Sequence, residues 1–380
     1  EFTFSKINSR KKNLIFTNKH SYLKECNFYI VTVPTPVYKN NKTNLNFLKT
    51  ATKTISKYLK HKDTVVYEST VYPGVTENFC APILEKYSKL KLRNQHNQKF
   101  VKDNFFYIGY SPERINPGDK INKITKIIKV TSGSTNEVAD FIDSLYSSII
   151  DAGTHKAPSI KVAEASKAIE NAQRDVNISF INELTLIFDL LGIDTNDVID
   201  AASTKWNFLK FKPGLVGGHC IGVDPYYLVH KAESLGYNPE VILSGRRVND
   251  YMGMFIANKL IKLMIKRGIT LKGAKVLLLG ITFKENCPDY RNSKVIDIYS
   301  ELNRFGLNVQ VYDPLANKKE LFNEYSIKLN YSLQKYEAII LAVAHKEFLS
   351  LDYKSLKNNN KIIIFDIKAF LNREIVDLRL

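Results

Sequence analysis

KVLLLG, at residues 275–280, is a short apolar run that ends in glycine, the pattern of a buried parallel strand followed by a tight turn. Similar runs recur at residues 309–314, 338–344 and 362–366, with enough chain between them for helices. An alternation of strands and helices predicts a doubly wound parallel sheet with helices on both faces. We therefore predict a Rossmann-like domain over residues 269–380.

The same alternation is present nearer the N-terminus, with a predicted helix around residues 45–60. Strands are predicted there at residues 27–33, 64–70, 105–111 and 127–131. Between the two alternations, over residues 158–202 and 240–267, apolar residues recur three and four positions apart, which is typical of long helices. The predicted fold class is α/β, with two Rossmann-like doubly wound domains joined by a helical middle domain. The predicted boundaries are residues 1–156, 157–268 and 269–380.

The chain has 380 residues, a formal net charge of +17 and 44% hydrophobic residues, which suits a globular protein of two or three domains. Its lysines are spread along the whole chain, without a compact basic tract or a nucleic-acid-binding module. This distribution favours solvated surface charge over a nucleic-acid groove, and a nucleic-acid-binding function rests on charge alone. The excess positive charge would help to attract an anionic nucleotide substrate.

No apolar run reaches the length of a membrane span and the N-terminus has no signal-peptide pattern, so we expect a cytoplasmic location without a membrane partner. The four cysteines stand at wide, irregular spacing and form neither a disulfide framework nor a metal-binding signature. We therefore expect no metal. A reducing compartment would suit a free, reactive thiol.

GLVGGHCIGVDPYY, at residues 214–227, places one cysteine among small residues, with a carboxylate four positions later. Gly217 and Gly218 allow positive φ and a close approach of the backbone to a ligand. The Cys220 sulfur is then expected to be accessible, and a thiolate forms covalent adducts with carbonyl groups. A buried cysteine in a tight turn is the alternative that this residue type leaves open.

Lys167, Asn171 and Arg174 recur at positions i, i+4 and i+7 of a predicted helix. This spacing puts a cation, an amide and a second cation on one face of the helix. A lysine and an amide are suited to stabilising negative charge that develops on oxygen. An exposed polar stripe explains the spacing equally well.

The run at residues 214–227 and the helical segment AEASKAIEN at residues 163–171 resemble the UDP-glucose/GDP-mannose dehydrogenase family. The wording GGHCIGVDPYY is similar to the branch of that family that oxidises UDP-N-acetylhexosamines (GlcNAc or GalNAc) at C6. The resemblance extends from about residue 14 to the C-terminus. It implies NAD as cofactor, a homodimer, and a role in the biosynthesis of surface polysaccharides such as O-antigen or capsule.

The resemblance also implies a chemical mechanism. Cys220 traps the C6 aldehyde as a thiohemiacetal, and a second hydride transfer converts it to a thioester. Lys167 and Asn171 stabilise oxyanions, while Asp224 supports the cysteine loop or a proton path. Glu113 and Thr70 assist the water that releases the uronic acid.

The binding residues implied by the resemblance come from several segments. For the cofactor they are Thr35, Ser69, Thr70 and Arg291. For the substrate they are Arg114, Ile115, Lys167, Asn171, Arg174, Gly217, Arg246, Phe283 and Lys284. Arg246, preferred over Arg247, is expected to reach the neighbouring subunit's site.

The glycine-rich GxGxxG turn of a dinucleotide-binding domain is not found before the first predicted strand. Aligned to the family, residue 1 falls about two strand–helix units into the cofactor domain, so we expect an N-terminally truncated NAD-binding domain. This departure leaves open an inactive UDP-sugar-binding or subunit-interaction remnant. UDP-N-acetylmannosamine or UDP-glucose as substrate is a further alternative, and the sugar epimer is open.

Overall fold

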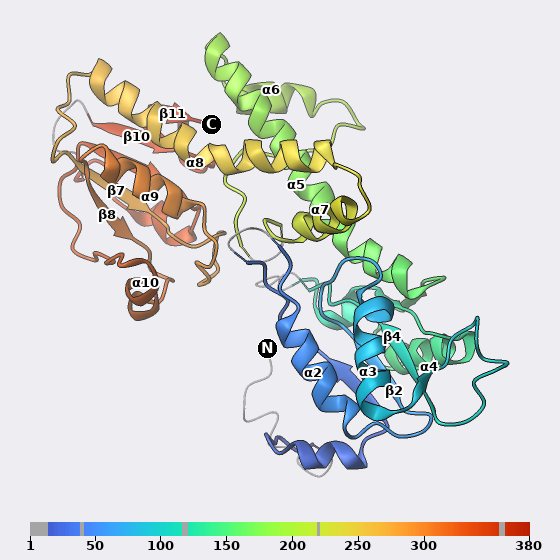
Figure 1. Ribbon diagram of the computed structural model, residues 1–380. Coiled ribbons are helices and arrows are strands. Elements are labelled where there is room, and N and C mark those ends of the chain that lie inside the picture. The colour runs from blue at the N-terminus through green and yellow to red at the C-terminus, as the bar shows by residue number, and fades with distance from the viewer. Residues whose placement is uncertain (1–13, 39–41, 116–120, 219–220, 357–361) are drawn as a thin grey trace. The chain divides into compact units, whose positions relative to one another are not determined.

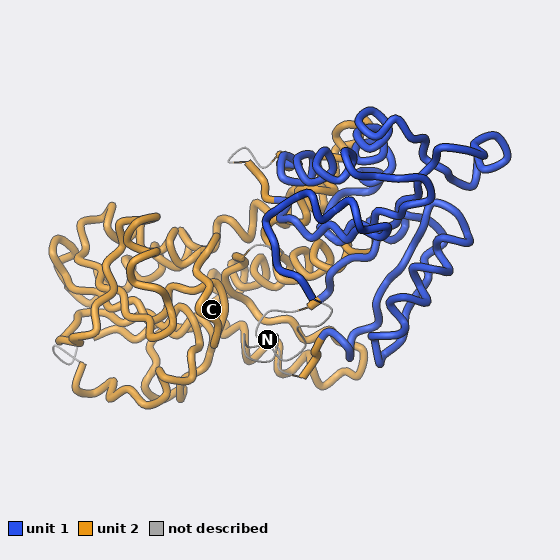
Figure 2. Tube along the Cα trace, turned by 90° about the horizontal axis from the view of Figure 1, so that it is seen from below, with its two compact units in different colours: residues 1–35, 44–114, 124–164 blue, residues 36–43, 115–123, 165–380 orange. Residues whose placement is uncertain are grey.

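The computed structural model describes residues 14–38, 42–115, 121–218, 221–356 and 362–380. The chain divides into two units, which Figure 2 shows in different colours. Unit 1 comprises residues 1–35, 44–114 and 124–164, and unit 2 comprises residues 36–43, 115–123 and 165–380. The division falls inside one long helix, α5 (Ile160–Leu191).

Unit 1 is built on a parallel sheet in the order β1-β2-β4-β3. The strands are β1 (Phe28–Val31), β2 (Thr64–Tyr67), β4 (Phe105–Tyr110) and β3 (Lys91–Leu92). A separate parallel pair is formed by β5 (Lys129–Thr131) and β6 (Thr154–Lys156). Every residue of β2 is buried, as its apolar composition predicts for a central parallel strand. The predicted strands of this part of the chain are confirmed, each with slightly different ends.

The helices of unit 1 follow their sequence signals. Its α-helices are α2 (Asn46–Ser56), α3 (Ala81–Ser88) and α4 (Asn136–Ser147), and its short helical turns are η1 (His20–Glu25), η2 (Thr76–Cys80) and η3 (Ile124–Lys126). Thr135 caps α4, because its side chain accepts a hydrogen bond from the Val138 amide. Leu48 of α2 and Leu84 of α3 are buried in the same core as Val65 of β2. These helices therefore fix the positions of the loops that leave the sheet.

Unit 2 begins with a helical part that consists of α5, α6 (Thr195–Ala202), α7 (Asp224–Ser234) and α8 (Glu240–Lys266). The helical stretch predicted at residues 158–202 contains α5 and α6, and the one predicted at 240–267 contains α8. Helix α7 was not predicted, since its first residues belong to the cysteine run. Pro225 favours a helix start at this position, because proline fits the first turn where its missing N–H is not needed.

The second part of unit 2 is a five-stranded parallel sheet in the order β11-β10-β9-β7-β8. Its strands are β7 (Lys275–Leu279), β8 (Asn308–Tyr312), β9 (Ala338–Leu341), β10 (Ile363–Asp366) and β11 (Leu378–Arg379). Its helices are α9 (Val295–Arg304) and α10 (Lys318–Tyr325), with the short turns η4 (Lys346–Ser350) and η5 (Arg373–Ile375). All four predicted strands are present. Helices α8 and α9 pack against this sheet and against each other (Figure 1).

Numbered within this domain, the strand order is 2-1-3-4-5, and the direction of winding reverses between β7 and β9. In open parallel sheets, ligands bind at the carboxyl ends of the strands beside such a reversal. The fold therefore directs attention to the loops that follow β7, β8 and β9.

Candidate active site

The carboxyl ends of β1, β2 and β4 lie in register, so that the chain leaves the unit 1 sheet at Val31, Tyr67 and Tyr110. Beyond these ends the first two loops are joined by side-chain hydrogen bonds. The Thr35 hydroxyl donates to the Thr70 carbonyl over 2.6 Å, and the Ser69 hydroxyl donates to the Val33 carbonyl over 2.6 Å. The structure thus brings together three residues that the sequence assigned to the cofactor.

The direction of these two bonds affects what the loops can bind. Thr35 and Ser69 each give their hydroxyl hydrogen to a backbone carbonyl, so toward any further partner each hydroxyl oxygen can act only as an acceptor. Such oxygens suit a donor such as a ribose hydroxyl better than a phosphate oxygen, which itself accepts. The edge of this sheet therefore fits the ribose part of a dinucleotide.

Glu113 and Arg114 lie beyond the end of β4, in the same unit. Both are half-buried, and the Arg114 guanidinium donates to the Ile128 carbonyl over 2.8 Å. Ile115, next in sequence, is exposed. Neighbouring strands of one sheet thus deliver Thr70 and Glu113, the two residues expected to assist water.

Glu164 is a residue that the motif assignment passed over, although it stands three positions before Lys167 in the helical segment that carries the family resemblance. It is fully buried and accepts hydrogen bonds from the Gly74 and Thr76 amides over 2.5 and 2.8 Å. Burial raises the pKa of this carboxyl to about 7, against the opposing effect of the two amides. Glu164 therefore fixes the chain just beyond Ser69 and Thr70 to helix α5.

Within unit 2, the three polar residues predicted to share one face of α5 (Lys167, Asn171 and Arg174) differ in burial. Lys167 and Asn171 are buried, whereas Arg174 is exposed. The Asn171 amide nitrogen donates to the Asp224 carboxylate over 2.6 Å, and Asp224 is the first residue of α7. The structure thus unites three predicted catalytic residues from two helices, and leaves Arg174 apart from their buried cluster.

Asp224 has an altered protonation equilibrium in this cluster. Burial raises its pKa to about 6, although the Asn171 hydrogen bond and the Lys167 charge act in the opposite direction. A carboxyl group that titrates near pH 6 can exchange a proton close to neutral pH. This property fits the proton path that the family resemblance implies for Asp224.

The shifted pKa of Asp224 predicts a pH dependence of stability. Its folded-state pKa, about 6, exceeds its ordinary value of 3.8, so the folded state binds more protons between these pH values. The free energy of unfolding should therefore fall as pH rises from about 4 to about 6, by roughly 3 kcal/mol from this group alone. Urea unfolding of wild type and Asp224→Asn across this range measures the difference. A wild-type curve that runs parallel to the variant's would contradict the assignment.

The glycine-rich run before the cysteine is held on two sides. Asn182 of α5 makes two hydrogen bonds with the Gly214 backbone, donating to its carbonyl and accepting from its amide. A Cβ at Gly217 would lie 2.5 Å from the Asn292 carbonyl oxygen, and one at Gly218 would lie 2.8 Å from the Phe283 ring. Only glycine allows the loop after β7 to approach so closely, and this approach places Asn292 beside Gly217 and Phe283 beside Gly218. Cys220 itself lies outside the described residues.

Replacing Gly218 with alanine should lower the free energy of unfolding by more than the left-handed conformation of Gly218 alone explains. Gly218 has φ +84° and meets Phe283, whereas Gly236 has φ +83° and no heavy atom within 4 Å of the place that a Cβ would occupy. Gly236→Ala should therefore lower the free energy of unfolding by about 1 kcal/mol, from the left-handed conformation alone. Gly218→Ala should lose about 1–3 kcal/mol more through the clash, together with enzymatic activity. Equal losses of stability in urea unfolding would show that Phe283 does not pack on this loop.

The two candidate arginines on α8 have different surroundings. Arg246 is buried, and its guanidinium donates to Asp175 over 2.7 Å and to Asp250 over 2.6 Å within the same chain. Its charge is also placed 5.7 Å from the centre of the Tyr226 ring. Arg247 is exposed and donates to the Ser244 hydroxyl. The Arg246 guanidinium is thus bound within this chain, and the role predicted for it at a neighbouring subunit's site stays a prediction.

The remaining predicted residues lie in the loop after β7. Arg291 is exposed and binds Asp289 through two nitrogens, at 2.9 and 2.7 Å. Lys284 is half-buried beside Phe283. Asp289 thus orients Arg291, and the roles of Arg291 and Lys284 in ligand binding stay predictions.

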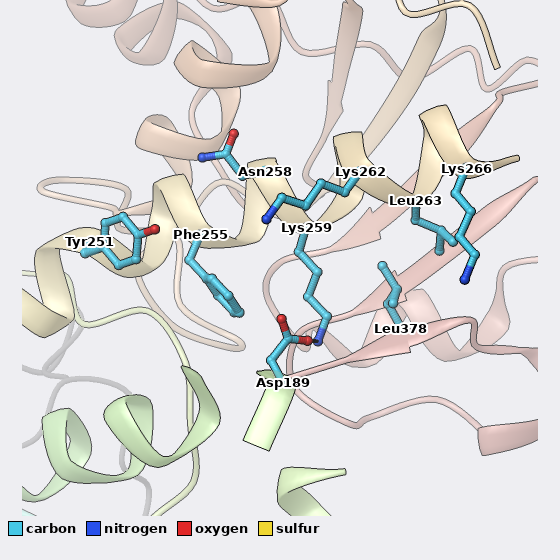
Figure 3. A pocket seen from close by; sticks show the side chains of 9 residues that line it. All are labelled: Asp189, Tyr251, Phe255, Asn258, Lys259, Lys262, Leu263, Lys266 and Leu378. Atoms are coloured by element: carbon cyan, nitrogen blue, oxygen red, sulfur yellow. Dashed lines mark ion pairs between the residues drawn. The ribbon is translucent and has the colours of Figure 1, made fainter. Parts of the chain in front are cut away.

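A cavity of about 440 Å³ lies on α8 of unit 2 (Figure 3). It is lined by Asp189, Tyr251, Phe255, Asn258, Lys259, Lys262, Leu263, Lys266 and Leu378. Lys259 is paired with Asp189 over 2.7 Å, and none of the predicted site residues lines the cavity. Over the described ranges, no group of histidine, cysteine, aspartate or glutamate side chains is arranged to hold a metal ion.

None of the helices that the structure describes combines the length and apolar character needed to cross a membrane. The main parallel sheets of units 1 and 2 both carry hydroxyl, amide and charged groups on the loops at their carboxyl ends. These features define a nucleotide-binding protein with two Rossmann-like parts. Three family models match the chain, all of the UDP-glucose/GDP-mannose dehydrogenase family. They are the NAD-binding domain over residues 3–150, the central domain over residues 161–251 and the UDP-binding domain over residues 277–373.

Individual relatives agree with this match. A UDP-N-acetyl-D-glucosamine 6-dehydrogenase of Pseudomonas aeruginosa is 53% identical over 97% of this chain and 86% of its own length. A protein of the same name from Salmonella typhi is 50% identical over 97% and 85%. A solved UDP-D-ManNAc dehydrogenase from Pyrococcus horikoshii superimposes with a TM-score of 0.83 at 27% identity, over 96% of this chain and 82% of that one.

The chain therefore belongs to the UDP-glucose/GDP-mannose dehydrogenase family. It contains the NAD-binding domain of that family, and the predictions of NAD as cofactor and of the α/β fold are confirmed. The family model of the NAD-binding domain matches residues 3–150, although these residues contain no GxGxxG turn.

Proposed function

We propose that this protein oxidises C6 of a UDP-N-acetylhexosamine to the carboxylate in two NAD-dependent steps. The observation that carries the proposal is the buried cluster of Lys167, Asn171 and Asp224, in a chain whose glycine loop leads directly to Cys220. A lysine and an amide held in a buried site stabilise oxygen anions more strongly than they would in water. The names of the relatives from Pseudomonas aeruginosa and Salmonella typhi support the same substrate class.

Each residue has a defined task in this mechanism. The Cys220 thiolate adds to the C6 aldehyde and keeps it on the enzyme as a thiohemiacetal. Oxidation of that adduct gives a thioester, which water cleaves to the uronic acid and the free thiol. Lys167 and Asn171 stabilise the oxyanions, and Asp224 orients Asn171 through their hydrogen bond. Glu113 and Thr70 position and deprotonate the water.

NAD supplies the hydride acceptor when it is bound. Thr35, Ser69 and Thr70, at the carboxyl edge of the unit 1 sheet, would hold its ribose, and Arg291 would reach it from the loop after β7. The substrate would contact Arg114, Ile115, Arg174, Gly217, Phe283 and Lys284. Division of the chain at residues 1–156, 157–268 and 269–380 into cofactor, middle and UDP-sugar domains is part of this proposal.

The gluco configuration is the best-supported epimer. Relatives named for UDP-N-acetyl-D-glucosamine share 50–53% of residues with this chain, whereas those named for UDP-N-acetyl-D-mannosamine share 30–32%. Protein CapL of Staphylococcus aureus is 50% identical over 98% of the chain. A role in surface polysaccharide synthesis is part of the proposal. The sequence motif GGHCIGVDPYY of the cysteine loop disfavours UDP-glucose as the substrate.

A homodimer through the helical part of unit 2 is also proposed. Leu190, Leu191 and Trp206 are between 64% and 92% exposed there, and large exposed apolar side chains of this kind would be available to a partner subunit. Arg247, exposed on α8, is the better candidate for a contact with the neighbouring subunit's substrate. A cytoplasmic location stays a prediction.

The test is the number of NADH molecules formed per sugar, followed at 340 nm, when the purified protein is mixed with NAD and each UDP-N-acetylhexosamine. Two NADH per UDP-N-acetylglucosamine oxidised, with the uronic acid as product, are expected. Retained UDP-sugar binding in calorimetry without NADH would instead identify an inactive UDP-sugar-binding protein. Faster turnover of the manno or galacto substrate would overturn the proposed epimer.

A further inference from the structure

Three loops of the unit 2 sheet meet at one buried polar cluster. Thr282 follows β7, Asp313 follows β8 and His345 follows β9, and all three are fully buried. The ends of these strands are aligned, since Leu279 pairs with both Tyr312 and Leu341. The cluster therefore lies at the carboxyl edge of the sheet, beside the reversal of strand order where ligands bind in such folds.

The hydrogen bonds determine the protonation of His345. The Asn286 amide donates to Nδ1 over 2.9 Å, so Nδ1 carries no proton and the ring hydrogen resides on Nε2. Nε2 lies 2.9 Å from the Thr282 hydroxyl and 3.2 Å from the Asp313 carboxylate, so its hydrogen is shared between two acceptors. The Thr282 hydroxyl can accept because it gives its own hydrogen to the Lys284 carbonyl over 3.1 Å. Every proton in the cluster thus has one consistent position.

Asp313 holds the same loop from its other end. Its Oδ2 accepts from the Ile281 and Thr282 amides over 2.7 and 3.2 Å, and its Oδ1 accepts from the Leu315 and Ala316 amides. Burial alone would raise the pKa of Asp313, but the hydrogen bonds from His345 and the amides lower it, so the group is a carboxylate. In dinucleotide-binding domains an acidic residue after the second strand binds ribose. Here the corresponding Asp313 instead accepts hydrogen bonds from backbone amides of the loops after β7 and β8.

Residues 281–286 are consequently fixed at both ends, by Asp313 at Ile281 and Thr282 and by His345 at Asn286. Between these points lie Phe283, which contacts Gly218 of the cysteine run, and Lys284. We propose that His345 is a positioning residue, which holds residues 281–286 so that Phe283 and Lys284 receive the UDP part of the substrate. This inference rests on the proposed function, because the substrate it concerns is the one proposed there.

The two ring nitrogens can be tested separately. His345→Ala removes the hydrogen bonds of both ring nitrogens. His345→Asn keeps an acceptor near the Nδ1 position for Asn286, and His345→Gln keeps a donor near the Nε2 position for Asp313. Tyr353→Phe is the matched control, since it removes one buried hydrogen bond of the same domain, which Tyr353 donates to the Phe348 carbonyl and not to residues 281–286. All four variants are compared with wild type in steady-state kinetics with UDP-N-acetylglucosamine and in amide hydrogen exchange without ligand.

His345→Ala should raise KM about tenfold or more while kcat changes by less than about threefold. In the variant, substrate binding must itself order residues 281–286, and this lowers the net free energy of binding. Hydrogen exchange at residues 281–292 should become faster in this variant and stay unchanged in Tyr353→Phe. His345→Asn should recover more of the wild-type KM than His345→Gln, since the Asn286 bond is the one that reaches the far end of the loop. A KM equal to that of Tyr353→Phe, or better recovery by glutamine, would overturn the inference.

Failure of the proposed function would give a different result. If the wild-type protein oxidises no UDP-sugar, hydrogen exchange and calorimetry with UDP alone decide the question. Faster exchange in residues 281–292 with about tenfold weaker UDP binding in His345→Ala would support the positioning role. Unchanged exchange, or unchanged UDP binding despite faster exchange, would contradict it.

Discussion

Replacing Cys220 with alanine is expected to reduce formation of the uronic acid by a factor on the order of 10³ or more, because no other group can form the thioester. In the sequence, Cys220 follows the glycines at 214, 217 and 218, and these are the residues that Asn182 and the loop after β7 contact. The loss should appear in kcat, with little change in the affinity for UDP. Product analysis and calorimetry with UDP measure the two effects.

Cys287 provides the matched control for this variant. It is a buried cysteine of the loop after β7 for which the sequence suggests no role, and Cys287→Ala should retain two NADH per sugar. If Cys220→Ala still forms uronic acid at a rate within about tenfold of wild type, covalent catalysis by Cys220 is ruled out. Loss of UDP binding in Cys220→Ala would point to damage of the loop as the cause.

Replacing Lys167 with methionine is expected to lower kcat by about 10²–10³, the usual cost of removing one donor that stabilises an oxyanion. Lys167 is buried on α5 within reach of the charge of Asp224, so methionine fills its space but supplies no hydrogen bond. KM for the sugar nucleotide should change less than kcat, since the interaction is strongest in the transition state. Steady-state kinetics at saturating NAD separate the two parameters.

Lys161, on the same helix, is the control for Lys167. Its side chain is 57% exposed and lies 3.9 Å from Glu77, a surface pair of the kind that contributes little. Lys161→Met should therefore keep wild-type kcat. Equal kcat values for the two methionine variants would show that the buried Lys167 ammonium takes no part in catalysis.

Local sequence patterns predicted most of the fold. The mostly apolar runs at the start of residues 64–70 and 275–280 form strands because a central parallel strand is buried on both faces and is therefore largely apolar. The three- and four-residue spacing over residues 160–191 became one helix for the same local reason. Helix α7 was missed, since its start coincides with the cysteine run, whose glycines indicated a loop.

Part of the candidate site was also predictable, where a residue's role follows from its own helix or loop. Lys167 and Asn171 are four positions apart, so a helix places them on one face without help from the rest of the chain. The pairing of Asn171 with Asp224, 53 positions later, required two helices to pack. The choice between Arg246 and Arg247 likewise depended on Asp175, a buried carboxylate on another helix.

The sequence alone determined the α/β class, most of the strands and long helices along the chain, and the presence of a cysteine in a glycine-rich run. These depend on apolar periodicity and residue type within short windows. Only the tertiary structure decided that His345 and Thr282, 63 positions apart, share a proton, that Glu164 holds two amides near Thr70, and that Arg246 is bound internally. Such contacts depend on which strand ends and helix faces come together, because a buried polar group takes whatever partner packing brings within reach.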